Sequence, residues 1–194
     1  MTSISSLCVF CGSKFGEDPA YLEAARELGA EVARRGIRLV YGGGGIGLMG
    51  AVATAALAGG GEVIGVIPEF LTKYEVGNPG ITRLIEVDSM HERKRTMFEL
   101  SDGFVVLPGG LGTLDETFEM ITWKQLRQHS KPIVILDAAG YWAPFRAMVD
   151  SIIAGGFAHP AAADLFSVVS ETDDVFDALA NAPEPDDVVL TSHL

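Results

Sequence analysis

Short apolar runs alternate with longer segments of helical periodicity along this chain of 194 residues. The apolar runs predict strands, and the segments with apolar residues three and four apart predict helices. The predicted strands are residues 4–10, 37–41, 62–67, 84–87, 103–107, 133–136 and 166–169. The predicted helices are residues 19–35, 47–58 and 90–100, a helix of about 15 residues starting near Thr113, and residues 142–154 and 173–180.

The alternation indicates one domain with a parallel sheet. Strands that are apolar on both faces need helices over both faces, which is the α/β doubly wound, Rossmann-like class. We predict this single domain over residues 1–182 and an acidic, loose tail at 183–194. Ligands in such sheets bind beyond the carboxyl ends of the strands. The turns to search are therefore Gly12-Ser13, Gly42 to Gly47, Pro68-Glu69, Ser89 to Arg95 and Pro108 to Thr113.

The turn after the fifth predicted strand carries three glycines in four positions, between Pro108 and Thr113. Backbone N–H groups at such a turn can approach an anion closely, and the helix that follows adds a favourable dipole. Thr113 is expected to cap that helix, with Glu116 three residues later as in a capping box. The alternative is a tight turn and a capped helix without a ligand. The segment is not a P-loop, because no lysine follows the glycines.

Three cations in a row, Arg93, Lys94 and Arg95, open the helix predicted at residues 90–100. Successive helical side chains point about 100° apart, so at most one or two of them can face a single pocket. Cations at a helix start oppose its dipole, which favours an anion-binding role over a merely solvated basic face.

Two shorter patterns carry less information. Residues 45–50 match the dinucleotide fingerprint Gly-x-Gly-x-x-Gly, and Glu69 follows about 20 residues on. A nucleotide-lining role, close backbone packing and an NAD site remain open for this segment. Cys8 and Cys11 match Cys-x-x-Cys, but strand alternation points them to opposite faces, which predicts buried structural cysteines.

Charge and composition narrow the class of ligand. The net charge of −12 argues against a nucleic acid polymer, yet nine acids and no Lys or Arg lie beyond Arg146. Residues 1–146 are therefore almost balanced and can bind a small anion. The chain shows no membrane span, no secretory signal and no disulfide framework, and its four histidines have no metal-ligand spacing. We expect a cytoplasmic protein without a bound metal.

Taken together, these segments resemble the LOG (Lonely Guy) family, the cytokinin riboside 5′-monophosphate phosphoribohydrolases, which are often mislabelled as lysine decarboxylases. The resemblance covers most of the chain and rests on the following motifs: Cys11-Gly12-Ser13, Tyr41-Gly42-Gly43 to Gly50, Gly65 to Pro68 with Leu71, Met90-His91-Glu92-Arg93-Lys94, and Pro108-Gly109-Gly110-Leu111-Gly112-Thr113 to Glu116. Lys14 departs from the pattern, since a second serine is common there, and so does the run Leu126 to His129.

The resemblance implies hydrolysis of the N-glycosidic bond of AMP or of an N6-modified AMP such as isopentenyl-AMP. Arg93 and Glu116 fall on the family's catalytic positions, and members similar to this chain are homodimers that need no cofactor. The substrate-binding positions that it implies are Glu75, Lys94, Gly110 to Thr113 and Thr122. From the same turns we add Gly109, Ser13, Gly43, Gly44 and Met90 as binding candidates.

Glycosidic cleavage builds oxocarbenium character on the ribose, which a carboxylate such as Glu116 can stabilise while it positions the attacking water. We expect the 5′-phosphate on the amides of Gly109 to Thr113. Arg93 is expected to contact either the phosphate or the departing base. The alternatives are a non-catalytic nucleotide-binding or carrier protein on the same fold, and an NAD-dependent oxidoreductase. Lysine decarboxylation is disfavoured, because no recognisable cofactor-bearing lysine motif is present.

Overall fold

The computed structural model describes residues 4–72, 78, 80–184, 186 and 188–189. Its centre is a seven-stranded sheet in which every pair of neighbours is parallel, with strand order β4-β3-β2-β1-β5-β6-β7. The strands are β1 Ser6–Phe10, β2 Arg38–Tyr41, β3 Val63–Pro68, β4 Arg83–Val87, β5 Gly103–Val106, β6 Ile133–Leu136 and β7 Ser167–Val169. The predicted doubly wound α/β class is confirmed.

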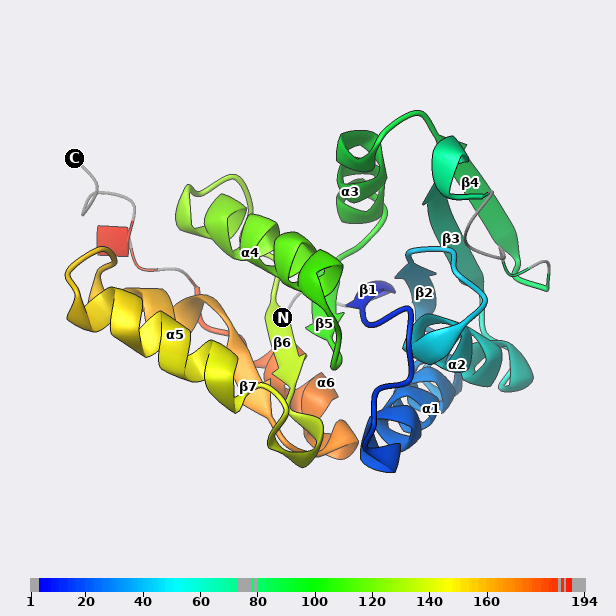
Figure 1. The fold of residues 1–194 in the computed structure, drawn as a ribbon, viewed down its shortest axis with the longest axis horizontal. Helices are drawn as coiled ribbons and strands as arrows, with labels where there is room; N and C mark the ends of the chain where they lie inside the picture. Colours follow the sequence, from blue (N-terminus) through cyan, green and yellow to red (C-terminus); the bar gives the residue numbers. More distant parts are fainter. Residues whose placement is uncertain (1–3, 73–77, 79, 185, 187, 190–194) are drawn as a thin grey trace.

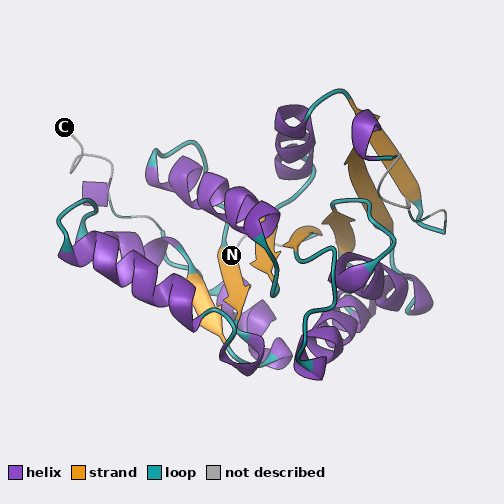
Figure 2. Ribbon diagram, in the orientation of Figure 1, coloured by secondary structure: helices purple, strands orange, loops and turns teal. Residues whose placement is uncertain are grey.

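Helices cover both faces of this sheet (Figure 1). Figure 2 shows the same alternation of strand and helix that the sequence pattern predicts. The helices are α1 Pro19–Arg34, α2 Gly47–Ala58, α3 Met90–Glu99, α4 Leu111–Gln125, α5 Ala143–Ala154 and α6 Thr172–Ala180. Three short 3₁₀ segments, which the sequence pattern did not predict, lie at Glu69–Leu71, Ala138–Gly140 and Pro160–Leu165.

The apolar side chains form two clusters, one on each face of the sheet. One cluster joins the sheet to α1, α2 and α6, and the other joins it to α3, α4 and α5. Because strand side chains alternate, Cys11 enters the first cluster and Cys8 the second. Both cysteines are buried and free, as their spacing predicts.

Helix α1 shows how local sequence sets an element. Asp18 caps its start by accepting a hydrogen bond from the backbone N–H of Ala20, and Pro19 occupies the first turn. Gly36, which follows the end of the helix, has a φ of 66°, a left-handed conformation that favours glycine. Gly29 faces α2 so closely that a Cβ there would overlap the Val52 carbonyl.

Helix α4 begins earlier than predicted. Its first residue is Leu111 and its N-cap is Gly110, which supplies no side-chain cap. The prediction that Thr113 caps this helix, with Glu116 completing a capping box, is therefore wrong. Thr113 is buried inside the first turn, so it packs under the glycines instead of flanking the helix.

Part of the predicted tail packs against the domain. Val189 is buried in the cluster shared by α4 and α5, with Val188 partly buried beside it. The apolar character of these two residues accounts for their packing, despite the acids that precede them.

The strand order reverses direction between β1 and β5. β1 pairs with β2 on one side and with β5 on the other, and Val9 lies opposite both Tyr41 and Val105. The loops that leave β1 and β5 then diverge to opposite faces, which opens a crevice at the carboxyl edge. A hydrogen bond from the Gly12 N–H to the Pro108 carbonyl (3.0 Å) ties the two loops together at this point.

His129 is held as a neutral ring beneath α4. Its Nδ1 accepts a hydrogen bond from the Lys131 N–H (3.1 Å), so its Nε2–H donates to the Met120 carbonyl (2.9 Å). The ring also packs edge-on against Phe98 and Phe104. Protonation of Nδ1 would place its N–H against the Lys131 N–H, so the charged ring would lose this hydrogen bond.

This arrangement predicts a loss of stability in mild acid. Burial lowers the pKa of His129 from 6.5 to about 4, helped by the Lys124 and Lys131 ammonium groups and opposed by the Met120 hydrogen bond. Between these two pH values the unfolded chain binds a proton that the folded chain does not, so the free energy of unfolding should fall as the pH drops through this window. Urea titrations at several pH values should show a flatter profile for His129→Gln. Parallel profiles for the two proteins would contradict the assignment.

Candidate functional site

Arg93 is a buried guanidinium fixed to the ends of two strands. Its Nη2 donates to the Gly42 carbonyl (2.7 Å), just beyond β2, and its Nε donates to the Val66 carbonyl in β3 (3.1 Å). Gly42 has to be glycine here, because a Cβ would overlap this guanidinium. The Met90 sulfur lies 4.0 Å from Nη1. The rigid fork of the side chain is therefore locked in one orientation.

The remaining arm of the fork faces Glu116. Arg93 Nη1 lies 3.9 Å from Glu116 Oε1, and both side chains are about nine-tenths buried. This separation allows charge attraction but exceeds hydrogen-bond length. A buried carboxylate is tolerated when an opposite charge compensates it, so the pair places a negative and a positive group together at the carboxyl edge of the sheet.

The start of α3 sets the position of Arg93. The Ser89 hydroxyl accepts from the Glu92 N–H (3.2 Å), and the Glu92 carboxylate accepts from the Asp88 N–H (3.0 Å). This reciprocal capping fixes the first turn of the helix. Of the three cations, Arg93 and Lys94 are buried, whereas Arg95 is exposed and pairs with Glu99. Two of the three cations are therefore buried and the third is in solvent.

Lys94 joins α3 to α4. Its ammonium lies 3.0 Å from Asp115 and 3.0 Å from Glu119, the two acids that flank Glu116 on α4. Burial alone would lower the pKa of Lys94, but the hydrogen bonds to the two carboxylates outweigh it and raise the pKa. The ammonium is therefore charged and already engaged by protein groups.

The glycine-rich start of α4 is open toward solvent. A Cβ at Gly110 or at Gly112 would meet nothing within 4 Å, whereas one at Gly109 would overlap Thr113. Helix starts leave backbone N–H groups without intrahelical partners, and Gly110 provides no side-chain cap for them. Gly112 and Thr113 lie one turn before Glu116 and hence on the same side of the helix. The helix thus presents donors and a carboxylate about one turn apart.

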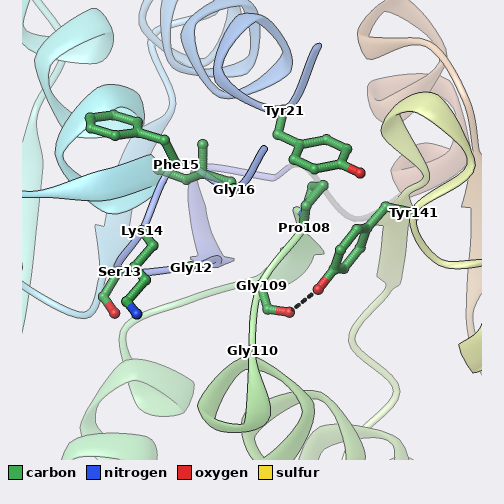
Figure 3. Close-up of a pocket in the computed structure, with 11 residues that line it drawn as sticks. Gly12, Ser13, Lys14, Phe15, Gly16, Tyr21, Pro108, Gly109, Gly110 and Tyr141 are labelled. Atoms are coloured by element: carbon green, nitrogen blue, oxygen red, sulfur yellow. Dashed lines mark hydrogen bonds between the residues drawn. The ribbon is translucent and has the colours of Figure 1, made fainter. Parts of the chain in front are cut away.

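A cavity of about 380 Å³ lies beside this helix start (Figure 3). The loop after β1 lines one side of it, through Ser13 and Lys14, while Gly109, Gly110 and Tyr141 line the other. Arg93 and Glu116 do not line this cavity. Gly109 and Gly110, which do line it, lead directly into α4, the helix that carries Glu116.

The glycines after β2 serve close packing. A Cβ at Gly47 would overlap the backbone of Ser13, and one at Gly50 would overlap the Gly45 carbonyl. Gly43 and Gly44 are buried, and the Gly43 carbonyl accepts a hydrogen bond from the Asn78 N–H (3.3 Å). Close packing thus accounts for two of the three glycines of the pattern at residues 45–50, Gly47 against the β1 loop and Gly50 against Gly45.

The two thiols behind the site are unreactive. Burial, and then the nearby negative charge of Glu116, raise the pKa of both Cys8 and Cys11 well above the ordinary thiol value. A thiolate is the reactive form of cysteine, so neither residue can act as a nucleophile.

The structure brings some of the predicted site residues together and leaves others apart. Arg93, Glu116, Met90 and the glycine segment lie around the ends of β2, β3 and β5, whereas Thr122 is exposed further along α4. Glu75 lies outside the described residues. Sequence reasoning missed Asp115, Glu119 and Tyr141. The two acids are four residues apart on either side of Glu116, a helical spacing that could have marked them as a clamp.

Two classes of feature are absent from the part of the chain that the structure describes. None of its helices is both long and apolar enough to cross a membrane. Nor do its His, Cys, Asp and Glu side chains gather in threes where they could hold a metal ion.

The fold is a Rossmann-like α/β domain, and its candidate site lies at the carboxyl ends of the strands. A family model described as "Possible lysine decarboxylase" matches residues 49–179. Among curated proteins, a probable cytokinin riboside 5′-monophosphate phosphoribohydrolase LOGL9 of Oryza sativa subsp. japonica is 51% identical over 160 residues, which are 82% of this chain and 70% of that protein.

Two further relatives agree with this match. The cytokinin riboside 5′-monophosphate phosphoribohydrolase LOG of the same plant is 48% identical, over 78% of this chain and 62% of that protein. The LOG1 enzyme of Arabidopsis thaliana is 46% identical, over 80% of this chain and 73% of that protein. The chain belongs to the LOG family of cytokinin riboside 5′-monophosphate phosphoribohydrolases.

Solved structures agree on the fold alone. A molybdenum cofactor binding protein from Rippkaea orientalis has a TM-score of 0.69 at 19% identity, covering 93% of this chain and 98% of its own. A Moco carrier protein from Chlamydomonas reinhardtii has a TM-score of 0.69 at 23% identity, covering 91% of this chain and 96% of its own.

Proposed function

We propose that this protein hydrolyses the N-glycosidic bond of AMP carrying an N6 substituent, such as isopentenyl-AMP, or of AMP itself. The products are the free base and ribose 5-phosphate. The observation that carries the proposal is Glu116, buried against Arg93 and one turn beyond an uncapped, glycine-rich helix start. The family membership of the chain supports the same reaction.

The 5′-phosphate binds at the start of α4. The backbone N–H groups of residues 110–113 supply donors there, and the helix dipole adds partial positive charge. Glycines at 110 and 112 leave space for the oxygens to approach. Ser13 and Lys14 line the adjoining cavity and contribute a hydroxyl and a cation on its far side.

Glu116 acts on the ribose. From Leu111 to Glu116 the helix rises about 7.5 Å, which suits a substrate whose phosphate sits at the helix start and whose anomeric carbon sits further along. As the base departs, positive charge develops on the ribose, and the carboxylate stabilises it and orients the attacking water.

Arg93 supplies a fixed positive charge to the site. Two of its donors are committed to strand carbonyls, and the third nitrogen faces Glu116. It compensates the buried carboxylate and presents a positive edge toward the substrate. A conformationally fixed cation of this kind costs little reorganisation during the reaction.

Lys94 supports catalysis by fixing helix α4. Because its ammonium is bound by Asp115 and Glu119, it fixes the helical turn that carries Glu116. Lys94→Met should therefore lower kcat about tenfold or more and leave KM within about threefold. Steady-state kinetics on isopentenyl-AMP tests this, with Arg95→Met as the matched control at an exposed cation. A large rise in KM at unchanged kcat would instead place Lys94 on the substrate.

We extend the proposal to the assembly and location of the protein. Leu111 is 85% exposed at the start of α4, and Met148, Ile152 and Phe157 are exposed on or just after α5. A homodimer that buries this apolar face would bring a second chain close to the site. A cytoplasmic location fits a nucleotide substrate.

The reaction is tested directly with the purified protein. Incubation with AMP and with isopentenyl-AMP should release free base and ribose 5-phosphate in equal amounts, measured by chromatography. The ratio of kcat/KM between the two substrates gives the preference for the N6 substituent. Tight nucleotide binding without release of base would identify a carrier instead.

A further inference from the structure

Tyr141 lies in the connection that follows β6. Its side chain contacts the glycine segment, residues 108–110, which follows β5. It follows the 3₁₀ segment Ala138–Gly140, and its hydroxyl donates a hydrogen bond to the Gly109 carbonyl (2.5 Å). Its ring is held edge-on by Tyr21 (centroids 5.2 Å apart) and by Trp142 (4.8 Å). These ring contacts restrict rotation of the Tyr141 side chain and so fix the position of its hydroxyl.

Three consecutive carbonyls of the glycine segment are each held by a different partner. The Pro108 carbonyl accepts from the Gly12 N–H (3.0 Å), and the Gly110 carbonyl accepts from the Leu114 N–H (3.0 Å) within α4. The Gly109 carbonyl between them accepts from Tyr141. Backbone supplies the two outer bonds, so Tyr141 supplies the only side-chain bond among these three.

The direction of one carbonyl fixes the direction of the next N–H. A peptide unit is planar, with its C=O and N–H pointing in opposite directions. The Gly109 carbonyl points to Tyr141, so the Gly110 N–H points away from it. Figure 3 shows Ser13 and Lys14 on that opposite side of the Gly109–Gly110 segment. Glycine has few barriers to rotation, so this peptide needs an external restraint.

We propose that Tyr141 is a positioning residue for phosphate binding: its hydroxyl holds the Gly109–Gly110 peptide so that the Gly110 N–H is aimed at the phosphate of the substrate. This inference rests on the proposed function, since it assigns a role within the same site. Tyr141 itself lies on the carbonyl side of the peptide and acts only through it.

Tyr141→Phe tests this role because it removes the hydroxyl and keeps the ring packing. The KM for isopentenyl-AMP should rise about three- to tenfold, the factor expected for one neutral hydrogen bond, while kcat stays within about twofold. The Kd for ribose 5-phosphate, measured by calorimetry, should rise by the same factor as KM. The melting temperature serves to confirm that the fold survives.

Ser101→Ala is the matched control. It removes another hydroxyl bond to a carbonyl, from Ser101 to Met97 (2.8 Å), before the amino end of β5 and hence at the opposite edge of the sheet. Equal Kd values for Tyr141→Phe and the wild type, or equal losses in Tyr141→Phe and Ser101→Ala, would overturn the inference. A wild type that binds ribose 5-phosphate but releases no base would overturn the proposed function, while the Kd comparison would still decide the role of Tyr141.

Discussion

Replacing Glu116 with glutamine is expected to lower kcat on isopentenyl-AMP by about 10³-fold, with the fold preserved. The amide has almost the same shape as the carboxylate but carries no charge. It can therefore neither stabilise the developing positive charge on the ribose nor accept a proton from the attacking water. Because Arg93 lies 3.9 Å away and is anchored by Gly42 and Val66, it should stay in place when Glu116 changes.

The measurement is a single-turnover assay of base release, combined with binding of ribose 5-phosphate. Glu116→Gln should bind the product with nearly wild-type affinity, because the phosphate donors lie one turn away. Glu99→Gln is the matched control, since it makes the same chemical change at an exposed carboxylate that pairs with Arg95. Turnover within tenfold of the wild type would show that Glu116 is not the catalytic carboxylate.

Replacing Arg93 with lysine is expected to reduce both activity and stability. The ammonium keeps the positive charge but cannot reach the Gly42 and Val66 carbonyls with the geometry of the guanidinium fork. Loss of these two buried hydrogen bonds from a charged donor should lower the free energy of unfolding by about 2–4 kcal/mol. The misplaced charge opposite Glu116 should lower kcat/KM by about 10²-fold.

Urea unfolding and steady-state kinetics measure the two effects of Arg93→Lys. Arg95→Lys, two positions along α3, is the control, because Arg95 is exposed and its ion pair with Glu99 is a surface pair, which contributes little. A variant at position 93 with wild-type stability would mean that the two strand carbonyls do not depend on this side chain.

The strongly patterned elements could be predicted from the sequence. Residues 47–58 and 133–136 form α2 and β6 with the predicted bounds, because glycines mark both ends of the first, while Pro132 and Asp137 bound the apolar run of the second. The start of α4 was misplaced because two rules compete at this point. Threonine is a good N-cap, but the glycine turn lets the chain enter the helix two residues earlier, at Leu111.

The contacts that fix the site residues were harder to predict from the sequence. The motifs pointed to Arg93 and Glu116, but no local pattern shows that Arg93 is fixed by carbonyls beyond β2 and within β3, since such contacts depend on the sheet order. Lys94 lies in the same motif as Arg93, yet in the structure its ammonium group forms ion pairs with Asp115 and Glu119. Tyr141 had no signal, because its partner Gly109 is 32 positions away.

The missing cap of α4 ties helix folding to catalysis. Helices α1 and α3 complete their first turns with a capping side chain, from Asp18 and Ser89, whereas α4 follows Gly110, which has none. Under the proposed function, the substrate phosphate is the missing cap: the bonds that hold the ligand also finish the helix that carries Glu116. An aspartate at position 110 would improve the helix in isolation and at the same time occupy the seat of the phosphate. Substrate affinity and intrinsic helix stability are therefore opposing demands at this one glycine.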